Sequence, residues 1–205
     1  GGIYFSHIGP EGFISRDNWA YTRLLMSEFS PYYESGAKLT YQHSDELSFQ
    51  LHVVNGWQNV SDFGDHHPSL GTQVSYALPD GTTYSYNTFL GAEAEGIRFF
   101  NDLYAKVPVS ALVELGACFD IGTQQRENSH PHAQDQWYTW ALLSRFHLSP
   151  DLKATSRVEQ YLDHNNVIVS TANGRPFDVT SFSLGIDYQM SKGLWWRNEY
   201  RAFFG

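Results

Sequence analysis

Charged residues recur at every second position in two stretches of the chain. Arg157 and Glu159 form one row, and Arg197, Glu199 and Arg201 form the other. This spacing places side chains on one face of a β-strand. Rows of fixed charges along a water-filled channel can set its preference for ions. They can equally form a ladder of cross-strand ion pairs that fills the interior and stabilises the strands. The residues alone leave both interpretations open.

Charged residues in other stretches fall on the strand face that we expect to point into the barrel. Together with the two rows they form a set of candidate pore-lining residues. The set is Glu34, Lys38, Glu114, Asp120, Arg145, Arg157, Glu159, Asp187, Arg197, Glu199 and Arg201. We expect the sequence to supply only part of a ring of charges. No preference for cations or anions therefore follows from it.

Histidines gather at His66–His67 and at His130–His132, with Asp65 and Asp135 nearby. Structural zinc sites use cysteine and histidine at fixed spacings. The only cysteine, Cys118, belongs to neither group. We therefore predict solvated loop histidines, with no metal site and no cofactor.

An enzyme needs a nucleophile, a base and an orienting group within reach of one another. The combination of His52 with Ser48 or Ser75 comes nearest to this requirement. Polar residues of these types also line the interior of any barrel, so we predict no catalytic residues and no enzyme. Cys118 is interpreted as a small inward-facing filler, and a single cysteine forms no internal disulfide.

The elements that would position these residues are about eleven stretches of alternating apolar and polar residues. The clearest are residues 32–42, 46–54, 69–78, 111–122, 136–148, 180–189 and 194–204; residues 1–7, 82–90, 97–107 and 152–162 complete the set. Between 111 and 122 one face carries Val113, Leu115, Ala117, Phe119 and Ile121, which we expect to point outward. Glu114, Cys118 and Asp120 fall on the opposite face.

The connections between these stretches take turns being short and long. Short ones fall at residues 43–45, 79–81, 108–110, 149–151 and 190–193; longer ones fall at residues 8–31, 56–68, 93–96, 124–135 and 163–176. An up-and-down barrel in a bacterial outer membrane has tight periplasmic turns and longer outer loops. The pattern predicts an all-β, antiparallel up-and-down transmembrane β-barrel.

Aromatic residues cluster near the strand ends. Tyr41, Tyr76 and Trp196 lie by short turns, and Trp137 and Tyr161 lie by long loops. Aromatic girdles at both membrane interfaces would produce this distribution. We therefore expect two interfacial girdles; the alternative is the ordinary preference of Tyr and Trp for β-strands.

The directions of the strands predict an open sheet. The first and last strands both run outward if the short turns are periplasmic. Bacterial single-chain barrels have an even number of strands. We expect residues 1–205 to be one incomplete outer-membrane barrel domain, a fragment whose two edge strands do not pair.

One segment departs from the period of two. Apolar residues from Tyr21 to Phe29 follow helical spacing, and Ser15 is a suitable N-cap. The spacing predicts a helix over 15–29. Such a helix could fold inward and constrict the pore, or it could cap the outside, and the sequence leaves both open.

Several motifs resemble one known family. The stretch "FSHIGPEGFISRDNWAYTRLLMSEFSPYYESGAKLTYQ" and the following "LHVVNGWQNVSD" are similar to the OmpL-like β-barrel porins of Gram-negative outer membranes, as are "RFFNDLYAKV", "FDIGTQQR" and "WRNEYRAFF". The resemblance implies a porin-like barrel with no assigned substrate. It also implies strands before Gly1 and a final strand after Gly205.

Composition agrees with a membrane barrel. Charged residues make up 17% of the 205 residues, against about 25% in average soluble domains, and aromatic residues make up 16%. A mean hydropathy of -0.40 is no objection, because a barrel wall is apolar on one face only. The net charge of -9 argues against nucleic acid as a partner.

The sequence therefore predicts a channel in the bacterial outer membrane for passive diffusion of small hydrophilic solutes or ions. Its expected partners are outer-membrane lipid and those solutes, and oligomers are possible. The alternative is a closed or plugged barrel that acts as a structural or surface-binding protein.

Overall fold

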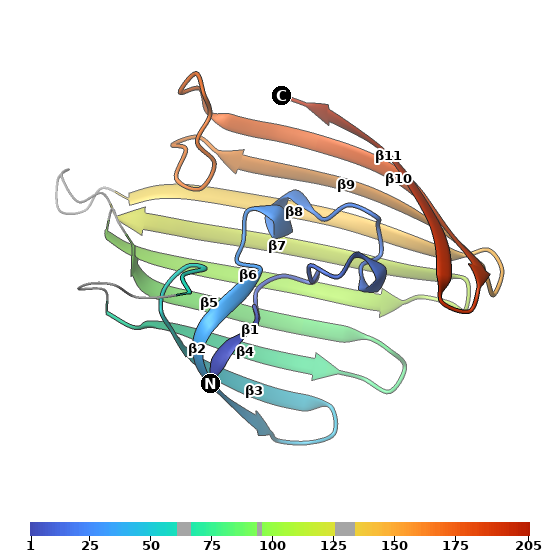
Figure 1. The fold of residues 1–205 in the computed structure, drawn as a ribbon, viewed down its shortest axis with the longest axis horizontal. Helices are drawn as coiled ribbons and strands as arrows, with labels where there is room; N and C mark the ends of the chain where they lie inside the picture. Colours follow the sequence, from blue (N-terminus) through green and yellow to red (C-terminus); the bar gives the residue numbers. More distant parts are fainter. Residues whose placement is uncertain (61–66, 94–95, 126–133) are drawn as a thin grey trace.

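The computed structural model describes residues 1–60, 67–93, 96–125 and 134–205. Across these residues eleven strands form one antiparallel sheet, and each strand pairs with its neighbours in sequence (Figure 1). The strands are β1 Gly2–Phe5, β2 Tyr33–Gln42, β3 Leu47–Val54, β4 Ser69–Ala77, β5 Thr83–Glu93, β6 Gly96–Pro108, β7 Val113–Gln125, β8 Gln134–His147, β9 Leu152–Asp163, β10 Phe177–Ser191 and β11 Leu194–Phe204. The predicted all-β, up-and-down architecture is confirmed.

Helix is confined to two short pieces of the described chain, η1 Ser15–Asp17 and α1 Leu25–Glu28. Neither is long and apolar enough to cross a bilayer.

The strand bounds follow the predicted stretches closely, and the differences lie mainly at the long-loop ends. β11 has the predicted bounds, whereas β7 continues from the predicted end at 122 to Gln125. The added residues are polar and still pair with β8, up to Gln125 opposite Gln134. Alternation of apolar and polar residues identifies only the part of a strand with one apolar face. The hydrogen-bonded strand extends beyond that part, so its predicted end falls too early.

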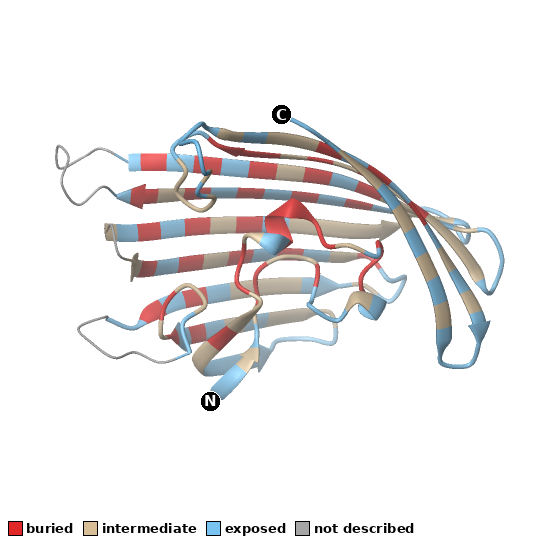
Figure 2. Cartoon of the chain, turned by 45° about the horizontal axis from the view of Figure 1, so that its top comes forward, coloured by how far each residue is buried: buried red, intermediate tan, exposed pale blue. Residues whose placement is uncertain are grey.

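The two faces of the sheet differ in burial along each strand, which Figure 2 shows as alternating bands. In β7, Leu115, Phe119 and Ile121 are 46%, 44% and 37% exposed, whereas Cys118 and Asp120 are buried. Ala117 is also exposed and Val113 is half-buried. The predicted facing of this strand is therefore confirmed.

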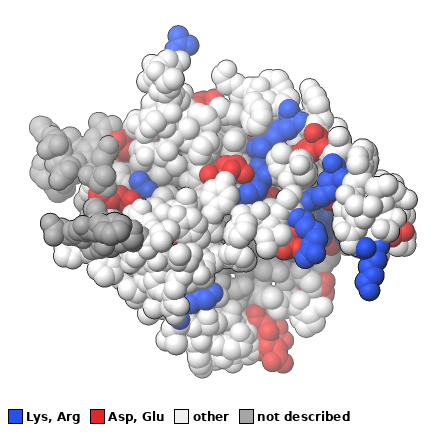
Figure 3. Space-filling view, in the orientation of Figure 1, with Lys and Arg blue, Asp and Glu red and all other residues white. Residues whose placement is uncertain are grey.

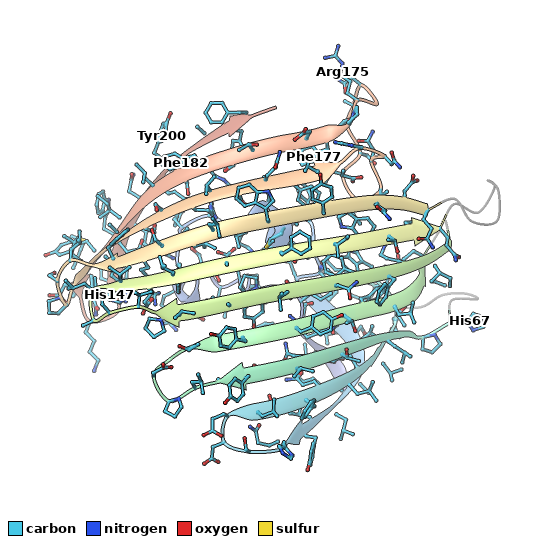
Figure 4. All side chains as sticks on the ribbon, turned by 180° about the vertical axis from the view of Figure 1, so that it is seen from behind. His67, His147, Arg175, Phe177, Phe182 and Tyr200 are labelled. Atoms are coloured by element: carbon cyan, nitrogen blue, oxygen red, sulfur yellow. The ribbon has the colours of Figure 1, made fainter. Side chains whose placement is uncertain are left out.

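The outer face continues this apolar surface over the rest of the sheet. Phe182 of β10 and Tyr200 of β11 are exposed, and Figure 4 shows them on the sheet from behind.

The hydrophobic core lies on the inner face. It includes Phe89, Phe100, Trp137 and Tyr161, packed with residues of the first long connection. The predicted interfacial position of Trp137 and Tyr161 is wrong, since they are 1% and 2% exposed. Trp137 lies over Gly122, where an added Cβ would come within 2.0 Å of the indole ring. Nearness to a strand end misled the prediction, because parity decides the face.

Residues 6–32, called the inner segment below, connect β1 to β2 and lie against the concave face of the sheet (Figures 1 and 2). The chain descends from His7 to the short-turn end of the sheet, where the Pro10 carbonyl accepts a hydrogen bond from Lys106 Nζ at 2.8 Å. It returns past β9 to Tyr32, whose carbonyl accepts from the Ser6 amide at 3.2 Å. The segment thus folds inward, one of the two placements that the sequence left open.

The short helix predicted in the first long connection is present as α1, but its predicted extent over 15–29 is wrong, and so is the N-cap role of Ser15. The residue before η1 is Ile14, no side chain caps η1, and the Ser15 hydroxyl donates to the Tyr21 carbonyl at 2.9 Å. Side chains of β9 and β11 satisfy backbone groups in this region that a helix would pair internally. Tertiary hydrogen bonds therefore replace the helical ones.

The sheet is open in the described residues. β1 pairs with β2 and β11 pairs with β10, and no ladder joins β1 to β11. This confirms the predicted lack of closure.

Candidate lumen-lining site

Two rows of charge on β9 and β11 meet across the intervening strand β10. Arg157 Nη2 donates to Glu199 Oε1 at 2.8 Å, and Arg201 Nη2 donates to Glu159 Oε1 at 2.6 Å. Arg157 Nε also lies 3.2 Å from Glu159 Oε1. Buried charges are costly unless they are paired, and here two arginines face two glutamates.

Small residues on β10 make this contact possible. Ser181, Ser183 and Gly185 occupy the inner face of β10. Ser183 is in register with both Arg157 and Arg201, Ser181 with Glu159, and Gly185 with Glu199. An added Cβ at Gly185 would come within 2.5 Å of Thr155 Oγ1. Large side chains here would separate the two charged rows, so the small residues let long side chains cross the strand.

The charged rows hold the inner segment. Thr22 is the centre of this contact: its carbonyl accepts from Arg157 Nη1 at 3.0 Å, and its amide donates to Glu199 Oε2 at 2.7 Å. The Leu25 amide donates to Glu159 Oε2 at 2.6 Å, and Arg201 Nη1 donates to the Arg23 carbonyl at 3.0 Å. The wall thus binds both donors and acceptors of the segment's backbone.

Arg197 forms a second anchor nearer the short turns. Its Nε donates to Asp187 Oδ1 at 2.8 Å, and its Nη2 donates to the carbonyls of Asn18 at 3.1 Å and Trp19 at 3.2 Å. Its Nη1 also donates to the Ser15 carbonyl. Figure 3 shows acidic and basic side chains gathered together on this face of the molecule, over the part formed by β9–β11.

A third group lies at the short-turn end. Arg145 Nε donates to Glu114 Oε2 at 2.6 Å, and its guanidinium lies 4.7 Å from the centre of the Trp19 ring. These residues border a cavity of about 180 Å³ that Lys106 also lines. Nearby, burial raises the pKa of the Glu11 carboxyl, which accepts a hydrogen bond from the Leu24 amide at 2.7 Å.

Asp120 lies beside another buried carboxyl group. It pairs in register with Asp102 of β6, and both carboxyl groups are buried. Asp102 Oδ1 accepts from the Gly9 amide at 3.1 Å and from the Asn87 side chain. This pair therefore also contacts the inner segment.

Glu34 lies between two histidines at the other side of the sheet. His7 Nδ1 is 2.6 Å from Glu34 Oε1, and His52 Nδ1 is 3.2 Å from Glu34 Oε2. The three side chains are almost fully buried. Lys38, four residues further along β2, is exposed, with Nζ 5.1 Å from the centre of the Tyr4 ring.

A protein family described as "Putative beta-barrel porin-2, OmpL-like" matches residues 1–204. The match spans nearly the whole chain.

The chain belongs to this family.

Among solved structures, one described as the NanC porin in a rhombohedral crystal form is similar, with a TM-score of 0.45 and 16% sequence identity. The similarity covers 82% of this chain and 80% of that one. No curated protein matches the chain. Membership in an OmpL-like porin family supports a porin-type channel.

In this OmpL-like porin chain the predicted pore-lining residues fall into separate groups. The largest unites Arg157, Glu159, Asp187, Arg197, Glu199 and Arg201 around the inner segment. Glu114 with Arg145, Asp120, Glu34 and Lys38 lie apart from it. The candidate histidines at His66 and His130–His132, and Asp65, lie outside the described residues.

Sequence reasoning missed the partners that the inner segment supplies to the OmpL-like porin wall. Thr22, Trp19 and His7 belong to a connection with no strand parity, so no periodicity marks them. The alternating Ser181, Ser183 and Gly185 were a usable signal, because small residues between two charged strands allow the charges to meet.

Proposed function

We propose that this chain forms the wall of a channel in the bacterial outer membrane through which small hydrophilic solutes or ions diffuse passively. In this proposal the inner segment narrows the lumen. The observation that carries it is the attachment of that segment to the inner face by Arg157, Arg197 and Arg201. A constriction held by charged hydrogen bonds restricts the size of a solute while keeping a polar path.

The outer face supports a location in lipid. Strands β5–β11 have 11 to 15 residues each, and about 9–11 residues suffice to cross a bilayer. Their exposed residues include many large apolar side chains, such as Leu103, Leu142 and Leu184. A surface of this kind is favourable against hydrocarbon and unfavourable against water.

The edge strands β1 and β11 have unpaired backbone groups, which the proposal must account for. Unpaired backbone groups are costly in lipid, which offers no hydrogen bonds. In our proposal residues 1–205 act as one barrel-wall domain, and the free edges of β1 and β11 are paired in the assembled membrane protein.

The charged residues contribute to this function mainly by positioning the inner segment. Opposite charges on β9 and β11 pair with each other, so their fields largely cancel at a distance. We therefore expect weak ion selectivity, with solute size as the main discriminator. In this proposal the path passes the candidate lining residues Glu114 and Arg145 at the short-turn end, which border a cavity of about 180 Å³.

Liposome swelling and reversal potentials test this proposal together. The whole protein is reconstituted into liposomes, and uptake is compared for uncharged sugars of increasing size. We expect entry of small sugars, a sharp size limit, and a reversal potential near zero in a salt gradient. Exclusion of every sugar together with absence of ion current would contradict a diffusion channel.

A closed barrel is the second candidate, and one observation favours it. Leu24 and Met26 of the inner segment are 0% and 1% exposed, so the segment packs tightly where it meets the wall. In a closed barrel the outer loops would carry the function. Folded protein that stays impermeable in the same assay would support this alternative.

A further inference from the structure

Two imidazoles and one carboxylate converge on a single point of the inner face. His7 lies at the start of the inner segment, Glu34 on β2 and His52 on β3, and their nearest donor atoms all lie within 4.8 Å of one another. Among the described residues this is the one group of three potential metal ligands that meets so closely. The three come from separate elements, so the fold itself assembles the cluster.

The hydrogen bonds of the two imidazole rings show which ring nitrogen carries the proton in each neutral histidine, and therefore which nitrogen presents a lone pair to Glu34. His7 Nε2 is 2.9 Å from the backbone carbonyl of Thr88, which has no proton to give. Nε2 of His7 must therefore carry the proton and donate it. His52 Nε2 is 3.1 Å from Gln50 Oε1, an amide oxygen that also only accepts.

Both Nδ1 atoms are then unprotonated in neutral rings, and both point at Glu34. With both rings neutral, two lone pairs face the carboxylate. A proton on His7 Nδ1 would account for its 2.6 Å contact with Glu34 Oε1, but it leaves the lone pair of His52 opposite Glu34 Oε2. Protons on both rings would stack two cations, because the ring centroids are 4.1 Å apart at an interplanar angle of 21°. A metal cation bound by both Nδ1 atoms and the carboxylate, in place of these protons, satisfies all three side chains.

The remaining surroundings fit such an ion. A metal-binding histidine typically donates its other N–H to a carbonyl or carboxylate, which fixes the ring and the tautomer; Thr88 and Gln50 supply these acceptors. Glu34 Oε2 is buried and has no hydrogen-bond donor. The Tyr4 hydroxyl lies 3.4 Å from His52 Nδ1, close to where a fourth ligand or a bound water would sit.

A glycine makes room for the cluster. Gly71 of β4 is paired with His52, and an added Cβ there would come within 2.6 Å of His7 Cε1. The position thus accommodates the His7 ring on the wall. Any side chain at Gly71 would push His7 away from Glu34.

We propose that His7, Glu34 and His52 bind a divalent transition-metal ion, with Zn²⁺ as the representative. Two imidazole nitrogens and one carboxylate oxygen form a ligand set that suits zinc, copper and nickel, whereas calcium and magnesium prefer oxygen ligands. The ion ties the start of the inner segment to β2 and β3. The site does not depend on whether the channel conducts.

Cu²⁺ spectroscopy on the unmodified sequence gives the first test. The whole protein, untagged and folded in detergent, is stripped with a chelator and loaded with one equivalent of Cu²⁺. Electron paramagnetic resonance should show coupling to two imidazole nitrogens. Absence of nitrogen coupling, or no bound copper after desalting, would overturn the proposal without any variant.

Competition with a chromophoric chelator then measures Zn²⁺ affinity for the protein and its variants. We expect one ion per chain, and a loss of affinity of at least about 100-fold in Glu34→Gln and in His52→Gln, by analogy with the 10–100-fold effects of outer ligand partners. Gly71→Ala should also weaken binding while leaving all three ligands in place. His43→Gln, at an exposed turn histidine, is the matched control and should bind as the parent does.

Heat-modifiable electrophoretic mobility confirms that each variant is folded before its affinity is compared. Equal Zn²⁺ affinity in the parent, Glu34→Gln and His52→Gln would mean that zinc binds elsewhere, and would also overturn the proposal.

Discussion

Arg157 contributes at the scale of a single residue by joining three parts of the molecule. Its guanidinium, with the side chain only 1% exposed, contacts Glu159, Glu199 and Thr22. Removing the charge takes away the arginine paired with Glu199 and leaves Glu159 with Arg201 as its cationic partner. We therefore expect Arg157→Met to destabilise the folded protein by about 3–5 kcal/mol, the cost of breaking a buried ion pair.

Urea unfolding in lipid vesicles, followed by tryptophan fluorescence, measures this change. Arg175→Met is the control, because Arg175 is exposed in a loop (Figure 4). Equal stability of the two variants would mean that the ion pairs across β10 contribute little.

Phe119 tests the facing of the wall. It projects from the middle of β7 on the outer face. Phe119→Arg should slow or prevent insertion, since an arginine facing lipid costs about 2–4 kcal/mol near the bilayer midplane. Leu148→Arg, beside a short turn, should cost far less. Folding yield into vesicles is the measurement, and equal yields would argue against the lipid-facing assignment.

The site residues divide by how they could be recognised. The alternation of side chains along a strand is enough to place Arg157, Glu159 and Glu199 on the inner face, because every second side chain of a strand points to the same face. It says nothing of His7, which lies in a connection and meets Glu34 only after β1, β2 and β3 have paired. Contacts of that kind depend on the register between strands, which a single sequence does not specify.

At the scale of elements, the inner segment shows why helical spacing failed. The apolar residues from Tyr21 to Phe29 do not face a common core, and only α1 is helical. Tyr21 is exposed, Leu24 is buried in one cluster, and Leu25 and Phe29 pack in another. Charged side chains from β9 and β11, more than 130 residues away, bind the backbone instead. Local periodicity cannot report such partners.

Hydrogen exchange tests this anchoring. The double variant Arg197→Gln, Arg201→Gln loses the donors to the carbonyls of Asn18, Trp19 and Arg23. We expect amides of residues 15–25 to exchange faster, because local opening needs fewer bonds to break. Amides of β7 should keep the parent rates. Unchanged exchange in the segment would mean that packing alone holds it.

The strands themselves were largely predictable, because each carries one face for lipid and one for the interior. β11 was predicted from Leu194 to Phe204 and has those bounds. Trp137 shows that residue type and nearness to a loop do not indicate which face of the sheet a side chain occupies. It was predicted to be interfacial because it is an aromatic residue near a long loop. Its neighbour Tyr138 is exposed, so strict alternation would have placed Trp137 inside.

At the scale of the whole molecule, the sheet curves around a segment of its own chain. The inner segment lies against the concave face of the sheet (Figure 2). Together with the apolar outer face, this arrangement fits the proposed wall narrowed by its own inner segment. This arrangement explains how a chain with a mean hydropathy of -0.40 can be a membrane protein. Its polar residues lie mainly on the concave face and along the inner segment.

Single-channel conductance in planar bilayers tests the central claim most directly. The whole protein is compared with a variant in which residues 10–29 are replaced by a short Gly/Ser linker that leaves His7 and Tyr32 in place. We expect a small, steady conductance for the parent and a clearly larger one for the variant, because the constriction is removed while the wall remains. Equal conductance in the two proteins, or none in either when both are folded, would contradict a channel narrowed by its inner segment.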